Sequence, residues 1–67
     1  MAVARVTKIT ASSTKSFQDA VLTAVARSNR SLRGVTGLHI LEQKAKIEKG
    51  KITEFRVTME ITFILED

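Results

Sequence analysis

The sequence predicts an α+β fold in the order β-α-β-β, with a three-stranded antiparallel sheet curled around one helix. Three patterns support this prediction: strict apolar–polar alternation near the end, a helical period in the first half, and a glycine-containing turn between two strand-like segments. At 67 residues, the chain is expected to form a single domain over residues 1–67.

The first expected strand covers Val3 to Thr10, which is rich in valine, threonine and isoleucine. The small residues Ala11, Ser12 and Ser13 that follow predict a turn. Ser13 is the expected helix N-cap, because its hydroxyl can accept a hydrogen bond from a free amide of the first turn.

The helix is expected from Thr14 to about Leu32. Apolar or small residues recur there at helical spacing and form one stripe for packing on a sheet: Phe17, Val21, Ala24, Val25, Ser28 and Leu32. Gly34 follows as the expected C-cap, because glycine adopts positive φ without strain.

The second strand is expected from Thr36 to Lys49. Its adjacent apolar residues Ile40 and Leu41 interrupt the alternation and predict either a β-bulge or a strand that passes from one environment to another. Residues 48–51 then form a hairpin turn, with Gly50 at positive φ.

The last strand, residues 52–66, alternates without interruption, and its apolar face is Phe55, Val57, Met59, Ile61, Phe63 and Leu65. At about 3.3 Å per residue it is about 50 Å long. A compact chain of this size has a diameter of only about 30 Å. The strand therefore either curls around the helix or projects beyond its subunit, and its open edges predict a homo-oligomer.

The residue types argue against an enzyme. His39 is the only histidine and there is no cysteine, which excludes disulfides and zinc held by clusters of cysteine and histidine. The glycines match no phosphate-binding loop. The start of the chain is too charged for a signal peptide, and no apolar run reaches membrane-spanning length, so we expect a cytoplasmic protein without membrane contact.

The net charge of +4 leaves a basic nucleic-acid-binding module open as an alternative. The aromatic residues are only three phenylalanines, on apolar faces, so a platform for stacking bases is missing and we do not favour this alternative. The carboxylates are hard oxygen ligands, which would suit Ca²⁺ or Mg²⁺ where symmetry gathers them.

In its element order the chain resembles the dodecins. The similarity extends to residues 11–13 before the helix, residues 24–27 and 32–33 near its end, and the closing strand 55–66. The resemblance implies a hollow homododecamer that binds or stores a small ligand. In most studied dodecins, paired flavins stack between tryptophans of neighbouring subunits and a glutamine of the last strand holds the ring edge.

This sequence departs from that pattern at both positions. It has Gly37 where the tryptophan is expected and Arg56 where the glutamine is expected. The resemblance therefore implies a shell without flavin stacking, with the ligand surface around Gly37, His39 and Arg56. Glu42 falls near an acid that lines an ion channel in some members, so it is the expected Ca²⁺ or Mg²⁺ ligand. A weak flavin binder remains an alternative.

Overall fold

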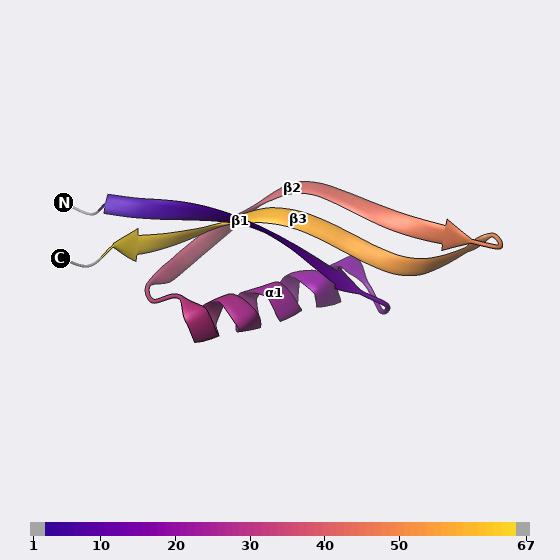
Figure 1. Ribbon diagram of the computed structural model, residues 1–67, viewed down its shortest axis with the longest axis horizontal. Helices are drawn as coiled ribbons and strands as arrows, with labels where there is room; N and C mark the ends of the chain where they lie inside the picture. Colours follow the sequence, from indigo (N-terminus) through magenta and orange to yellow (C-terminus); the bar gives the residue numbers. More distant parts are fainter. Residues whose placement is uncertain (1–2, 66–67) are drawn as a thin grey trace.

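The computed structural model describes residues 3–65, which form three strands and one helix (Figure 1). Strand β1 is Val3–Ser13, helix α1 is Phe17–Ser31, strand β2 is Val35–Glu48 and strand β3 is Lys51–Leu65. The strand order is β1-β3-β2, and both pairings are antiparallel. The predicted α+β fold class and the β-α-β-β order are confirmed.

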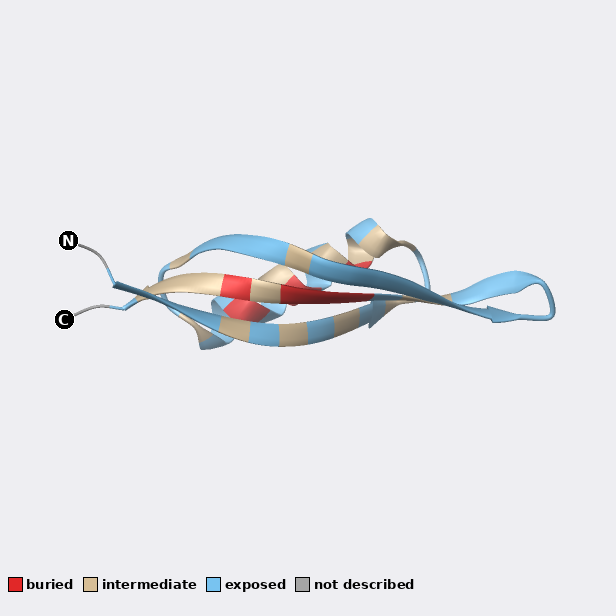
Figure 2. Ribbon diagram, turned by 90° about the horizontal axis from the view of Figure 1, so that it is seen from above, coloured by how far each residue is buried: buried red, intermediate tan, exposed pale blue. Residues whose placement is uncertain are grey.

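The core lies where α1 crosses the sheet, and β3 supplies most of it. Val57, Met59 and Ile61 are fully buried against the helix, which presents Ala20 and Ala24 (Figure 2). The small alanine side chains allow the helix to approach the sheet closely. At the start of α1, the rings of Phe17 and Phe55 pack edge to face with centroids 5.0 Å apart. Such a pair contributes about 0.5–1.5 kcal/mol to stability beyond the burial of the rings.

The strands extend well past the helix. The hairpin of β2 and β3 continues beyond α1 and the end of β1 (Figure 1), and residues 45–53 at its tip are all exposed (Figure 2). The molecule measures 52 × 19 × 13 Å, and its radius of gyration is 13.9 Å where a compact chain would have about 11 Å. Of the two arrangements expected for the long strand, the structure has the projecting one.

The start of the helix differs from the prediction. Ser16, not Ser13, is the N-cap, and its hydroxyl accepts a hydrogen bond from the amide of Asp19 at 2.9 Å. The predicted turn at residues 11–13 is wrong as well, because these residues continue β1 and pair with β3 as far as Phe55. The Ser13 hydroxyl instead supports the connection, donating to the Asp19 carboxylate at 2.6 Å.

The end of the helix also differs in detail. The C-cap is Leu32, whose amide donates to the Ser28 carbonyl, and not Gly34. Gly34 does adopt positive φ, at +70°, in the turn that leads into β2. Gly50 has φ of +77° in the hairpin turn as predicted, and Lys49 beside it also has positive φ, as in a type I′ turn.

Candidate functional site

Every expected ligand residue lies on the face of the sheet that points away from α1, which we call the outer face. Along β3, side chains alternate between the two faces. Because Val57, Met59 and Ile61 point to the helix, Arg56 and Glu60 point to the outer face. The pairing of β1 and β2 with β3 then decides which residues join them.

Four rows of side chains cross the outer face, each with one residue from β1, β3 and β2. In order along the sheet they are Val6, Thr62 and Gly37; Lys8, Glu60 and His39; Thr10, Thr58 and Glu42; and Ser12, Arg56 and Lys44.

A β-bulge in β2 decides the composition of these rows. His39 pairs with Glu60 and Glu42 pairs with Thr58, although the two β2 residues are three apart in sequence. In a regular strand such residues would point to opposite faces. The register shift between Ile40 and Glu42 restores both to the outer face, which confirms the bulge predicted at residues 40 and 41.

His39 contacts the carboxylate across the strand pair. Its Nδ1 lies 3.7 Å from Glu60 Oε1, and the two side chains are 74% and 39% exposed. Gly37 lies in the neighbouring row, opposite Thr62, and no heavy atom lies within 4 Å of the position that a Cβ would take there. The structure therefore brings Gly37 and His39 together on open surface.

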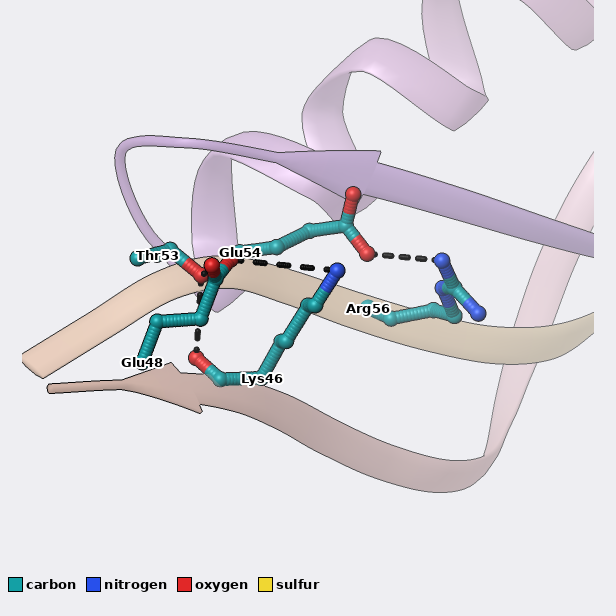
Figure 3. A network of polar contacts seen from close by, with 5 residues as sticks. All are labelled: Lys46, Glu48, Thr53, Glu54 and Arg56. Atoms are coloured by element: carbon teal, nitrogen blue, oxygen red, sulfur yellow. Dashed lines mark hydrogen bonds and ion pairs between the residues drawn. The ribbon is translucent and has the colours of Figure 1, made fainter.

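Arg56 lies apart from these two residues. It is four residues from Glu60 along β3, about 13 Å at the usual strand rise. Its Nη2 donates to Glu54 Oε1 at 2.7 Å, within a polar network on the projecting hairpin (Figure 3). In the same network, Lys46 Nζ lies 3.8 Å from Glu48 Oε1, to which the Thr53 hydroxyl donates at 3.2 Å.

This end of the outer face forms an open hollow of about 380 Å³, lined by Lys44, Ala45, Lys46, Glu54 and Arg56. Its cations are paired within the chain: Arg56 with Glu54, Lys46 with Glu48, and Lys44 with Glu42. An anionic ligand at Arg56 would therefore have to compete with Glu54.

A cation bound at Glu42 would find only one carboxylate of this chain, that of Glu42 itself. Its Oε1 lies 3.4 Å from Lys44 Nζ, and that ammonium group competes with a bound cation. Within residues 3–65, no three side chains of the histidine, cysteine, aspartate or glutamate type are grouped to hold a metal ion. A metal ion at Glu42 therefore requires ligands from another source.

A groove between α1 and β1 was not anticipated from the sequence. Its volume is about 500 Å³, and its lining combines apolar and hydroxyl side chains: Thr7, Ile9, Thr10, Ala11, Ser12, Thr23, Ala24, Arg27, Ser28, Ser31 and Leu32. It opens beside the free edge of β1. Sequence reasoning missed it because it depends on the helix-to-strand distance.

The described helix is neither long nor apolar enough to cross a membrane.

Sequence reasoning also missed Glu60, Glu54 and Lys44 as neighbours of the expected site residues. The alternation in β3 does assign Glu54, Arg56 and Glu60 to one face, and that signal was available. Their partners on β2 depend on the register, which the sequence pattern does not specify across a bulge.

Comparison with known proteins places the chain in a structural group. The family model described as Dodecin matches residues 3–66. The dodecin from Streptomyces coelicolor is 27% identical, with a TM-score of 0.92 over 98% of this chain and 94% of that one. An arginine-to-alanine variant of the Thermus thermophilus dodecin, 24% identical, shares the fold with a TM-score of 0.94 over the full length of both chains.

A third similar structure is that of a calcium-binding protein. It is the calcium-chelating immunodominant antigen of Mycobacterium tuberculosis, a calcium dodecin described as having a novel calcium-binding site. That protein is 28% identical, with a TM-score of 0.81 over 96% of this chain and 91% of that one. No curated protein sequence matches the chain.

Proposed function

Since the chain belongs to the dodecin family, we propose that it is a non-enzymatic cytoplasmic protein whose copies, twelve by family resemblance, assemble into a hollow shell that binds a small ligand. The observation that carries this proposal is the surface that a single chain leaves exposed. One chain has an accessible surface of 5173 Å², whereas a compact monomer of 7.4 kDa exposes about 4,200 Å². The excess of about 1,000 Å² is of the order that a specific protein interface buries.

The character of that surface also favours self-association. Large apolar side chains are half-exposed or more on each element, including Val6 on β1, Leu22 on α1, Ile47 on β2 and Ile52 on β3. The outer edges of β1 and β2 have no neighbouring strand within the described residues. Unpaired edges with apolar side chains aggregate unless a partner covers them, and another copy of the chain supplies such a partner.

We further propose that this shell does not stack flavins. Gly37 has no side chain, and the sequence contains neither tryptophan nor tyrosine that could substitute for the missing indole. Arg56 carries a guanidinium group in place of the glutamine amide that the resemblance expects, and this group is already bound to the Glu54 carboxylate. If flavin binds, we expect weak binding without stacking.

A second candidate function is binding of a divalent cation, Ca²⁺ or Mg²⁺. The calcium dodecin of Mycobacterium tuberculosis favours it, because it shares the fold and 28% of its residues with this chain. Glu42 is the proposed ligand, with further oxygen atoms from other copies. Calcium should then raise the unfolding temperature of the wild type, and Glu42→Ala should abolish the rise. Glu48→Ala is the matched control, since Glu48 is also an exposed carboxylate paired with a lysine. An equal rise in all three proteins would exclude Glu42 as the ligand.

Native mass spectrometry tests the main proposal, because it reports subunit number and retained ligand together. The expected species has a mass of about 89 kDa, for twelve chains of 7.4 kDa each. A riboflavin titration of the same sample should leave the fluorescence of riboflavin unquenched at micromolar concentration. A folded species of 7.4 kDa at dilute concentration would overturn the shell, and strong quenching would overturn the loss of flavin stacking.

A further inference from the structure

The pair of His39 and Glu60 offers two metal-ligating atoms side by side on open surface. Nδ1 and Oε1 lie 3.7 Å apart. Two atoms bound to one tetrahedral zinc ion, each at about 2.0–2.1 Å, lie about 3.3 Å apart. A small rotation of either side chain therefore brings the pair to ligand spacing.

The contact between these side chains is easily displaced by a cation. Both side chains are substantially exposed, and an exposed polar contact of this kind adds little stability. A metal ion can therefore insert between them without breaking a buried interaction. The β-bulge at residue 41 fixes the register that places them opposite one another, and a backbone feature of this kind holds the two ligands in place.

The ligand types select the class of metal. Imidazole nitrogen together with carboxylate oxygen suits Zn²⁺, Ni²⁺ or Cu²⁺, whereas Ca²⁺ and Mg²⁺ take oxygen ligands. Two other charged residues flank the pair on the outer face: Lys8 lies opposite Glu60 on β1, and Glu42 lies in the next row. This pair is therefore distinct from the calcium or magnesium site proposed at Glu42.

We propose that His39 and Glu60 form half of a site for a divalent transition-metal ion of the zinc class, and that a second copy supplies the other half. One pair leaves two positions of a tetrahedral ion unfilled, and two pairs fill all four. His39 lies on β2, whose outer edge borders no other described strand, so a second copy can approach it. This inference rests on the self-assembly proposed above for its second pair of ligands.

Isothermal titration of the wild-type protein with zinc chloride at about pH 7.5 tests the site. We expect about one zinc ion for every two chains, and a loss of affinity of about tenfold or more in His39→Gln and in Glu60→Gln. Glu48→Gln is the control, because it removes an exposed carboxylate of the same strand that belongs to neither proposed site; its zinc affinity should match the wild type. Calcium chloride should give no heat that depends on His39.

Native mass spectrometry of each variant separates this inference from the proposed function. An oligomer that binds no zinc, or binds it equally well in His39→Gln, would overturn the metal site and leave the shell standing. A monomer that binds no zinc would overturn both. A monomer that binds one zinc per chain through His39 would overturn the sharing of the site between copies.

Discussion

Gly34 lies directly against the backbone of Ile64. The Ile64 amide donates to the Gly34 carbonyl at 2.9 Å, and a Cβ on residue 34 would lie 3.1 Å from the Ile64 carbonyl oxygen. With φ of +70°, Gly34 also has a backbone conformation that other residues adopt only with strain. This contact joins the turn after α1 to the end of β3.

Gly34→Ala should therefore destabilise the protein by about 1–3 kcal/mol, through the strained φ and the close approach to Ile64. The measurement is the shift of the urea unfolding midpoint. Gly37→Ala is the matched control, because a Cβ there meets no atom within 4 Å and its φ is not positive, so it should unfold as the wild type does. Equal shifts for the two variants would contradict the account of Gly34.

Truncating an isoleucine should have very different effects at two positions of β3. Ile61 is fully buried, so Ile61→Ala should lower the free energy of unfolding by about 2–5 kcal/mol. Ile52 is 50% exposed on the projecting hairpin, and Ile52→Ala should change the stability of an isolated subunit by only about 0.5 kcal/mol.

Urea unfolding at several protein concentrations checks both isoleucine variants. Ile61→Ala should be destabilised at every concentration. Any additional loss in Ile52→Ala should appear only where the chain is assembled, since association couples stability to concentration. A large, concentration-independent loss in Ile52→Ala would show that the hairpin tip packs within its own subunit.

Removing the helix cap should weaken the fold measurably. Ser16→Ala deletes the hydroxyl that accepts from the Asp19 amide, and we expect a loss of about 1 kcal/mol. Thermal unfolding followed by circular dichroism at the helical band measures the effect. Ser12→Ala, at an exposed position of β1, is the control and should leave the unfolding temperature unchanged. A larger loss in Ser12→Ala than in Ser16→Ala would refute this assignment of the cap.

Restoring the two residues that the family resemblance calls for should create flavin binding. The space around Gly37 is open, so Gly37→Trp can be accommodated on the outer face, and Arg56→Gln supplies the amide. The double variant should quench riboflavin fluorescence at micromolar concentration, while wild type and Gly37→Leu do not, because an aliphatic side chain lacks the ring for stacking. Failure of the assembled double variant to quench would show that more than these two positions prevents flavin binding.

The elements could be predicted from local patterns, and their ends could not. The alternation in β3 and the helical stripe of α1 depend only on nearby residues. The end of β1 does not: residues 11–13 look like a turn in the sequence, but β3 is long enough to pair with them as far as Phe55. Ser13 and Ser16 are equally plausible caps by residue type, and only the extension of β1 to Ser13 excludes the first.

The site could be predicted only in part, because its geometry depends on strand register. The alternation in β3 predicts on which face of the sheet Arg56 lies. It does not predict where His39 lies relative to Glu60. Counted from the hairpin turn, that pairing depends on two register shifts, one between Lys46 and Ile47 and one at the bulge at residue 41. The ion pair between Arg56 and Glu54 was likewise missed. It joins two residues of one strand, and the sequence pattern does not predict the side-chain conformations that bring them into contact.

Val3 and Leu65 are paired neighbours at the end of the molecule opposite the hairpin tip. A segment fused genetically before Val3 and another fused after Leu65 would therefore leave the subunit at the same place. A short peptide joining them, together with a new chain break between Lys49 and Gly50, would give a circular permutant with the same strand order. In that permutant the exposed hairpin turn would become a pair of free ends for attaching labels or cargo.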